Sequence, residues 1–351
     1  MLRYNDKIVL DDMENIYCRN ITWGHLKNSS ILVTGASGML ATYVIYYLAY
    51  LNEYKGYHIE IYALVRNPMK ARDKFAELED KEYFHYLVQD VCETIELEND
   101  IDYIIHAAGN ASPKYILSDP VGIIKANTIG TISVLEFAVR KQVKRVLYTS
   151  TREVYGKCEK MEDLSEEDMG VLKIDELRSC YPESKRMAET ILESYKHQYN
   201  LSYVVARIAH SYGPGMNIDG DGRIMADLVS DTVNGRNITL KSDGTALRAF
   251  CYITDAVSAI LHILLQGEDS QSYNVANETE EYAIKDVAQL LCDLYPDRGI
   301  KVVFDIPQQQ SLGYSKMGRT KLNLNKLKQL GWQPQVGLRE GLKRTIDSFG
   351  I

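Results

Sequence analysis

The chain has 351 residues, of which 45% are hydrophobic and 25% are charged, and its formal net charge at pH 7 is -8. A chain of this length and composition can bury a large core, and we expect it to form two lobes. The acidic balance argues against the broad basic surface of a nucleic-acid-binding protein, but it leaves room for a local basic pocket that binds a phosphorylated small molecule.

Neither the cysteines nor the N-terminal residues indicate secretion or a metal site. The six cysteines are scattered, with no CxxC pair and no histidine at metal-ligand spacing, which favours reduced cysteines in a cytosolic protein. The first 20 residues carry frequent charges and lack the apolar segment of a signal peptide. The longest apolar run that we identify, residues 39–51, is too short to cross a membrane. We therefore expect a soluble, cytoplasmic protein that binds no metal, membrane or nucleic acid.

After a polar, partly helical extension at residues 1–28, strands and helices alternate. Apolar runs predict strands at residues 31–34, 58–65, 83–88, 103–106, 145–149 and 203–206. Helices are predicted at residues 39–51, 69–78, 121–141 and 181–199. This alternation predicts βαβ units and a doubly wound parallel α/β sheet, a Rossmann domain, over residues 29–207.

From residue 208 the chain is rich in glycine and less regular, which predicts a smaller mixed α/β lobe that binds the substrate. Helices are expected at residues 224–233, 254–265, 284–294 and 324–330. We expect residues 208–351 to form mainly this lobe, with some segments returning to the Rossmann domain. The helix that begins near Thr254 is the candidate for such a return.

The segment ILVTGASGML lies where the first predicted strand meets the first long helix. Gly35 permits a tight turn there, and Gly38 permits the close approach of a pyrophosphate, which the N–H groups at the start of the helix stabilise. Ala41 replaces the third glycine of GxxGxxG and still allows close packing. Because parallel units follow, the turn predicts a dinucleotide site; an ordinary turn is the alternative.

The end of the second predicted strand bears on the choice of cofactor. NAD enzymes of this type usually carry an acidic residue there. In this chain Arg66 occupies the position, and it favours NADP over NAD by offering a partner for the 2′-phosphate; a solvated surface charge is the alternative. Asp90, after the third strand, is placed to accept a hydrogen bond from the adenine amino group.

The motif YPESK, residues 181–185, begins a long predicted helix. Tyr181 and Lys185 are four residues apart and share one helix face. A phenol is a poor acid–base group at neutral pH, but a nearby ammonium group and a positively charged nicotinamide favour its phenolate form. We interpret the pair as catalytic, with Lys185 also able to hold the nicotinamide ribose.

The order of several motifs resembles the extended short-chain dehydrogenase/reductase family. These motifs are TGASGML, HAAGNASPKY, KANTIGTISVLEFA, STREVYG, YPESK, RIAHSYGPGM and LRAFCYITDA. The nucleotide-sugar branch, the NAD-dependent epimerase/dehydratase family, is the most similar, and the resemblance runs from about residue 31 to residue 349. Segments such as CYPESKR and LRAFCYITDAV look most like those of the UDP-glucuronate decarboxylase group.

The resemblance implies hydride transfer at C4 of a sugar linked to UDP or dTDP. Tyr181 would exchange a proton with the C4 hydroxyl while hydride passes between C4 and the nicotinamide, and Thr151 would align the C4 oxygen. Asn127 would tie together the backbone and a water molecule near Lys185. Glu153 completes the candidate catalytic set.

The same resemblance suggests contacts for both ligands. The candidate cofactor residues are Gly35, Ser37, Gly38, Met39, Leu40, Arg66, Asp90, Val91, Ala107, Ala108, Gly109, Asn127, Thr149, Tyr181 and Lys185. The candidate substrate residues are Ser112, Thr151, Arg152, His210, Arg223, Arg248 and Arg319. Arg248 and His210 are expected near the diphosphate, where a guanidinium group can bind two oxygens. Arg223 and Arg319 are weaker candidates, with surface charge as the alternative.

The motif STREVYG separates the possible reactions. In sugar 4,6-dehydratases the corresponding triplet is Thr-Asp-Glu, and its Asp acts as the acid at C6. Arg152 occupies that position, and a guanidinium group cannot usefully donate a proton at neutral pH, so dehydration is disfavoured. Glu153 matches the decarboxylase triplet Thr-Ser-Glu, but Arg66 and the segment LGYSKMGRTKL depart from that group.

These departures favour an NAD(P)H-dependent reductase of a nucleotide-linked 4-keto-hexose, including 6-deoxy forms, with a 4-epimerase as the alternative. Decarboxylation and dehydration rank lower. A scaffold that binds a dinucleotide without turnover is disfavoured, because it would not need Thr151, Tyr181 and Lys185. We also expect a homodimer, since members of the family commonly pair through four helices, which residues 121–141 and 181–199 could supply.

Overall fold

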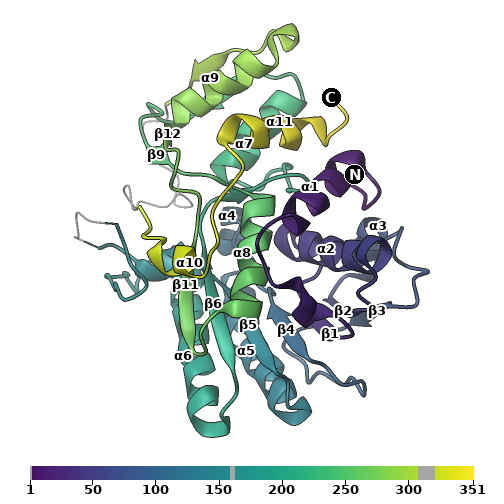
Figure 1. Ribbon diagram of the computed structural model, residues 1–351. Helices are drawn as coiled ribbons and strands as arrows, with labels where there is room; N and C mark the ends of the chain where they lie inside the picture. Colours follow the sequence, from purple (N-terminus) through teal and green to yellow (C-terminus); the bar gives the residue numbers. More distant parts are fainter. Residues whose placement is uncertain (1, 159–162, 307–320) are drawn as a thin grey trace.

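The computed structural model describes residues 2–158, 163–306 and 321–351, which form a sheet flanked by helices and a smaller lobe above one end of it (Figure 1). The seven strands of the sheet follow the order β11-β6-β5-β4-β1-β2-β3, and each neighbouring pair is parallel. Their bounds are β1 Ser30–Thr34, β2 Glu60–Val65, β3 Phe84–Val88, β4 Tyr103–His106, β5 Arg145–Thr151, β6 Tyr203–Ile208 and β11 Gln271–Val275. The predicted doubly wound α/β fold is confirmed.

Helices cover both faces of the sheet, because its strands are apolar on both sides. The long helices are α2 Met39–Lys55, α5 Pro120–Lys141, α6 Cys180–Tyr199 and α8 Ile253–Gln266. Ile31 and Val33 of β1 join one buried cluster with α2 and α8, whereas Leu32 joins another with α5 and α6. This alternation is the two-residue period of a strand. It places α6, which carries YPESK, on the face opposite α2.

Most predicted elements are present with shifted ends. β2 begins at Glu60 rather than at residue 58, because His58 has a left-handed φ of 57° that does not fit a strand. The helix predicted at residues 69–78 is shorter, α3 Pro68–Lys74, while β5 continues to Thr151. Strand β11 is not predicted from the sequence, because the polar residues Gln271 and Ser272 hide its apolar pattern.

The smaller lobe contains short helices and three two-stranded sheets. Its helices are α7 Ile224–Val233, α9 Ile284–Leu294 and α11 Leu338–Asp347. The strand pairs are β7 Ser211–Tyr212 with β10 Cys251–Tyr252, β8 Ile238–Leu240 with β13 Val302–Phe304, and β9 Leu247–Arg248 with β12 Tyr282–Ala283. Three further helices are α4 Pro113–Ser118, α10 Asn325–Gln329 and the short 3-10 helix η2 Arg152–Tyr155. Both α8 and β11 follow residue 207 in the chain, yet they pack with the large sheet.

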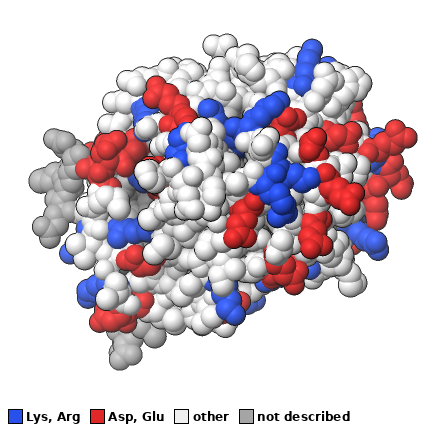
Figure 2. All heavy atoms as spheres, turned by 90° about the horizontal axis from the view of Figure 1, so that it is seen from below, with Lys and Arg blue, Asp and Glu red and all other residues white. Residues whose placement is uncertain are grey.

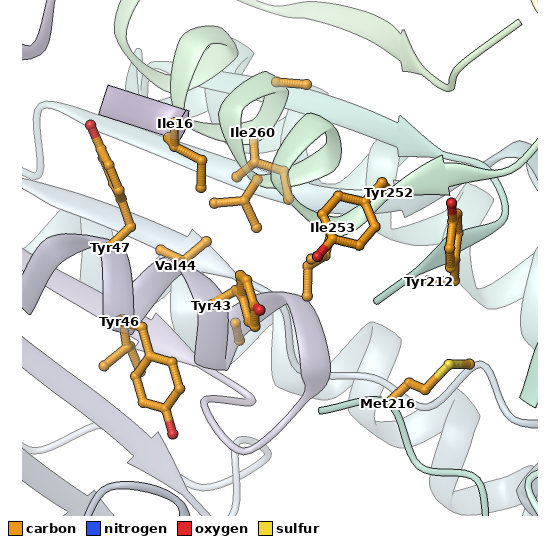
Figure 3. Close-up of a cluster of buried hydrophobic side chains, with 14 of the residues drawn as sticks. Ile16, Tyr43, Val44, Tyr46, Tyr47, Tyr212, Met216, Tyr252, Ile253 and Ile260 are labelled. Atoms are coloured by element: carbon orange, nitrogen blue, oxygen red, sulfur yellow. The ribbon is translucent and has the colours of Figure 1, made fainter. Parts of the chain in front are cut away.

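The N-terminal extension joins the two lobes. Its helix α1 Lys7–Tyr17 packs against α2 and α8, and Ile16 lies in the apolar cluster that Figure 3 shows. The buried carboxylate of Asp12 accepts hydrogen bonds of 2.9 Å from the hydroxyls of Tyr43 and Tyr252, and it pairs with Arg344 of α11. The first residues of the chain therefore contact both the helix after the glycine-rich turn and the smaller lobe.

Two surface features bear on possible partners. On the face seen in Figure 2, acidic and basic side chains are interspersed. Among the described residues, α5 is the one helix long and apolar enough to cross a membrane, a property that the sequence analysis did not note. Half of it is buried in the fold, and core helices of soluble proteins share that composition, so its length carries little weight.

Candidate functional site

The glycine-rich turn brings the ends of β1 and β4 together. Gly35 has a φ of 63°, and a Cβ atom there would lie 2.7 Å from the carbonyl oxygen of Ala107, so the position admits only glycine. The Thr34 hydroxyl accepts hydrogen bonds of 3.2 Å from the N–H groups of both Ala107 and Ala108. Gly38 precedes the first turn of α2 as its N-cap. The free N–H groups of that turn therefore face the edge of the sheet where β1 and β4 end.

The remaining candidate residues of this turn lie beside it. Ser37 is in the turn itself, and Met39 and Leu40 are the first two residues of α2, all three partly exposed. Val91 follows β3 and is buried against Gly130 of α5. The turn thus offers backbone donors and partly exposed side chains, which suit a phosphate group.

The floor of the site holds a buried amide with an unused acceptor. Asn127 of α5 is fully buried, and its Nδ2 donates to the Ser184 hydroxyl of α6 at 2.9 Å. Its Oδ1 is buried and has no hydrogen-bond partner among the described residues. A Cβ atom at Gly109 would lie 2.6 Å from that oxygen and 3.4 Å from Lys185 Nζ. Asn127, Gly109 and Lys185 therefore meet at one point, and Oδ1 is available to a water molecule or a ligand.

Lys185 is buried against the end of β5. Its Nζ donates to the Thr149 carbonyl oxygen at 2.8 Å and lies 4.5 Å from the centre of the Tyr148 ring. Burial lowers the pKa of Lys185 to about 7, and the negative charge of Glu189 acts in the opposite direction. The Lys185 side chain can therefore change between its amine and ammonium forms near neutral pH.

Tyr181 lies one turn before Lys185 and is also buried. Burial and the charge of Glu153 raise its pKa above the usual value, whereas the Thr151 hydroxyl, Arg178 and Arg223 act to lower it. The Thr151 hydroxyl is thus beside the phenol, while its role in aligning the C4 oxygen stays a prediction. Without a cofactor charge beside it, this phenol stays protonated at neutral pH.

Glu153 is held by a partner that the sequence analysis missed. Arg178 Nη2 donates to its two carboxylate oxygens at 2.7 and 2.9 Å. Thr151 is the N-cap of η2, and its Oγ1 accepts from the Glu153 N–H at 3.2 Å. A basic residue three positions before YPESK was the available signal, but only the fold brings it to STREVYG.

Arg152, His210 and Arg248 form a second group, which we call the arginine cluster. Burial lowers the pKa of Arg152, and the charge of Arg248 lowers it further, while Glu153 and Glu278 oppose both. Burial, aided by Arg152 and Arg248, also holds the pKa of His210 well below its usual value. His210 Nε2 is buried without a hydrogen-bond partner among the described residues, and its φ is 46°. A neutral imidazole on which two guanidinium charges act fits an anionic ligand.

Ser112 and Arg223 are linked through one residue that the sequence analysis did not single out. The Ser112 hydroxyl donates to the Asp221 carbonyl oxygen at 2.8 Å, and Arg223 binds the Asp221 carboxylate. The positive charge of Arg223 also acts to lower the pKa of Tyr181.

Arg66 and Asp90, two charged residues predicted to bind the cofactor, lie apart from Tyr181 and Lys185. The side chain of Arg66 is 80% exposed, and its Nη1 is 3.7 Å from Asp90 Oδ2. Asp90 Oδ1 accepts from the Cys92 N–H at 2.9 Å, and that bond holds the pKa of Asp90 below its usual value. Arg319 lies outside the described residues. In the described ranges, no three His, Cys, Asp or Glu side chains form a group that could hold a metal ion.

The sequence of the chain is similar to those of one protein family. The sequence profile of the NAD dependent epimerase/dehydratase family matches residues 31–276. UDP-glucuronic acid decarboxylase 6 of Arabidopsis thaliana is 33% identical over 326 residues, which cover 92% of this chain and 90% of that protein.

Solved structures support the fold. The epimerase Mth375 of Methanothermobacter thermautotrophicus superposes with a TM-score of 0.80 at 18% identity, covering 99% of this chain and 96% of that one. The UDP-glucuronic acid 4-epimerase of Bacillus cereus, in complex with UDP-glucuronic acid and NAD, gives a TM-score of 0.77 at 22% identity, covering 92% and 99%. At these identities the likeness establishes the fold alone.

Proposed function

Because the chain belongs to the NAD dependent epimerase/dehydratase family, we propose that it uses NAD to oxidise C4 of a UDP-linked sugar acid, which then loses its carboxylate. The observation that carries the proposal is the similarity to UDP-glucuronic acid decarboxylases along 92% of the chain. With His210 and Arg248 expected at the diphosphate, the buried Arg152 next to Thr151 supports a substrate that carries a further anionic group.

The residues fit a dinucleotide. Gly35 leaves no side chain at the point where β1 and β4 meet, and the start of α2 offers free N–H groups to a pyrophosphate. Asn127 Oδ1 and Lys185 Nζ lie together at the floor of the site, where the nicotinamide ribose would be held. When bound there, NAD supplies the acceptor for the hydride that leaves C4.

Tyr181 would act as the base at C4. Lys185 and the charge of a bound nicotinamide both lower the pKa of the phenol, so that it can take the proton of the C4 hydroxyl. Thr151 would hold the C4 oxygen in line with the phenol, since its hydroxyl already contacts Tyr181. The product of this step is a ketone at C4.

Loss of the carboxylate follows from the position of that ketone. A 4-keto sugar acid is a β-keto acid, so when the C5–C6 bond breaks, its electron pair moves into the C4 carbonyl and forms an enolate. CO2 leaves, and a proton from the medium replaces it at C5. The hydride taken from C4 would then return to C4 while Tyr181 gives its proton back to the C4 oxygen. Conversion of the sugar acid to the pentose is therefore redox-neutral overall and consumes no external oxidant.

A 4-epimerase of the sugar acid is a second candidate, and Arg152 is the observation that favours it. A buried guanidinium group that binds the carboxylate stabilises the charged form over departing neutral CO2. Tight binding by Arg152 would therefore retain C6 and let C4 return to either configuration.

The reductase expected from the sequence stays a prediction. It depended on Arg66 as a partner for the 2′-phosphate of NADP and on the segment LGYSKMGRTKL, most of which lies outside the described residues. Arg66 is an exposed side chain paired with Asp90. Exposed pairs of this kind contribute little and exchange partners readily.

Two incubations separate the three reactions, one with UDP-glucuronic acid and NAD and one with a 4-keto sugar and NADPH. The purified chain is incubated with UDP-glucuronic acid and NAD, and the product is analysed by mass spectrometry and proton NMR. We expect loss of the mass of CO2; an unchanged mass with a new C4 configuration supports the epimerase. Turnover that requires NADPH and a UDP- or dTDP-linked 4-keto sugar would replace the proposal with the reductase.

We also propose that the chain forms a homodimer through α5 and α6. Val121, Ile124, Ile129 and Ile132 of α5 are exposed, as is Met187 of α6. A row of apolar side chains on two neighbouring helices favours burial against a second copy. Size-exclusion chromatography with light scattering tests this, and Ile124→Glu should yield the monomer.

A further inference from the structure

Glu189 lies on α6 one turn beyond Lys185 and two turns beyond Tyr181, so the three side chains share a helix face. Its side chain is 15% exposed, and the reaction proposed above does not use it. A carboxylate this well buried needs partners that hold its charge.

Its partners come from two neighbouring strands. Ser150, the residue before Thr151 in β5, donates a hydrogen bond from its hydroxyl to Glu189 Oε1. Arg207 of β6 donates to Glu189 Oε2 from Nη2 at 2.6 Å and from Nε at 3.2 Å. Because Ser150 and Arg207 are paired across β5 and β6, one carboxylate ties the ends of both strands to α6.

Arg207 is fixed in turn by buried groups. Its Nη1 donates to the Tyr155 hydroxyl at 3.1 Å and to the Glu166 carbonyl oxygen at 2.8 Å. The Tyr155 hydroxyl donates to Asn274 Oδ1 of β11 at 2.6 Å. The network therefore runs from the edge strand β11, through Tyr155 at the end of η2 and Arg207 of β6, to the helix that carries the catalytic candidates.

We propose that Glu189 is a positioning residue, which holds the Thr151 end of β5 against α6 and so sets the arrangement of Thr151, Tyr181 and Lys185. Arg207 orients its carboxylate. The kinetic part of this inference rests on the proposed function; the tie between β5 and α6 does not.

The charge of Glu189 adds an effect that mere packing would not have. The groups around the Lys185 ammonium are Tyr181 and Glu189 on α6, Tyr148 on β5 and His106 on β4. Among them Glu189 is the carboxylate, and it opposes the lowering of the Lys185 pKa by burial. Without that charge, Lys185 loses its proton at a lower pH.

Glu193 provides a matched control one turn further along α6. It lines the same cavity of ≈ 290 Å³ as Glu189 and Arg207, and it accepts a hydrogen bond from the Tyr203 hydroxyl at 2.7 Å. Glu193→Gln removes the same charge from the same helix, but it leaves Ser150 and Arg207 bound to Glu189.

The test compares Glu189→Gln with Glu193→Gln in the full chain. Lysine side chains labelled with 13C are titrated by NMR without any sugar, and the Lys185 signal is assigned by its loss in Lys185→Arg. For Glu189→Gln we expect the Lys185 midpoint to fall by about one pH unit and kcat to fall about tenfold with a smaller change in KM. Glu189→Asp, which keeps the charge but is shorter, should restore the midpoint and not the full kcat.

Ser150→Ala covers the case in which Glu189→Gln does not fold. It removes only the hydrogen bond between Ser150 of β5 and Glu189. We expect it to lower kcat about tenfold. The inference is overturned if Glu189→Gln matches Glu193→Gln in both titration and kcat, or if Ser150→Ala retains full kcat. If the wild-type chain converts none of the sugars, the proposed function fails, and the titration still decides the role of the Glu189 charge.

Discussion

The two ends of the proposed cofactor site differ in how firmly the fold holds their charged groups. At the nicotinamide end, Lys185 is 4% exposed, and its Nζ contacts Thr149 and the Tyr148 ring. At the adenosine end, the Arg66 side chain is 80% exposed and is 3.7 Å from Asp90. A buried charge keeps the position that packing gives it, whereas an exposed one turns to whichever anion is near. The buried Lys185 therefore supports a definite role in binding the cofactor, and the exposed Arg66 does not.

The largest effect should come from the nicotinamide end. Tyr181→Phe removes the acid–base group and leaves the apolar contacts of the ring with Ile116 and Ile123. We expect turnover to fall about 1,000-fold or more, with NAD affinity within about twofold because the variant keeps Lys185 and the glycine turn. Steady-state kinetics and calorimetric titration with NAD measure the two quantities. Full activity in this variant would refute the assigned base.

The glycine turn should show the next largest effect. In Gly35→Ala the new Cβ lies 2.7 Å from Ala107 O, so β1 and β4 must separate at the place proposed to bind the pyrophosphate. We expect NAD affinity to fall about 10- to 100-fold, the equivalent of about 1–3 kcal/mol.

Gly56 is the control for that substitution. It also has a positive φ, 67°, but a Cβ there meets nothing within 4 Å. Gly56→Ala should lower thermal stability slightly and leave NAD affinity unchanged. Equal affinities in the two alanine variants would show that the turn does not bind the cofactor.

Glu153→Gln tests the nicotinamide end of the site through the pH dependence of the reaction rate. The charge of Glu153 raises the pKa of Tyr181, and Arg178, which it now binds, lowers that pKa. Removing the carboxylate takes away a negative charge that raises the pKa of the phenol. It also leaves the positive charge of Arg178 without its partner, and that charge lowers the same pKa. Because the base acts in its deprotonated form, which exists above its pKa, the acidic limb of the pH–rate profile should move to lower pH. An unchanged limb, or a shift to higher pH, contradicts this account.

The smallest effect is expected at the adenosine end. Arg66→Ala removes an exposed side chain, so NAD affinity should change by less than about twofold. Calorimetric titration with NAD and NADP measures this. If the wild type binds NADP at least tenfold more tightly and the variant loses that preference, Arg66 holds the 2′-phosphate, and the reductase regains support.

Local patterns were sufficient for the elements at the centre of the site. The apolar run before Gly35 and the four-residue spacing of Tyr181 and Lys185 are short-range features, and the structure places them as a strand, a turn and one helix face. The polar edge strand β11 and the shortened α3 were not predictable in this way, because contacts with distant elements determine where they begin and end.

By itself, the sequence determined the parallel α/β fold, the glycine turn and the pair Tyr181 and Lys185, because each depends on residues close together in the chain. Only the tertiary structure decided that Arg178 binds Glu153, that Arg207 and Ser150 meet at Glu189, and that Arg66 stays exposed. The partners in these contacts are up to 39 residues apart, as Ser150 and Glu189 are, and such pairs leave no periodic pattern in the chain. Their geometry follows from how β5, β6 and α6 pack together.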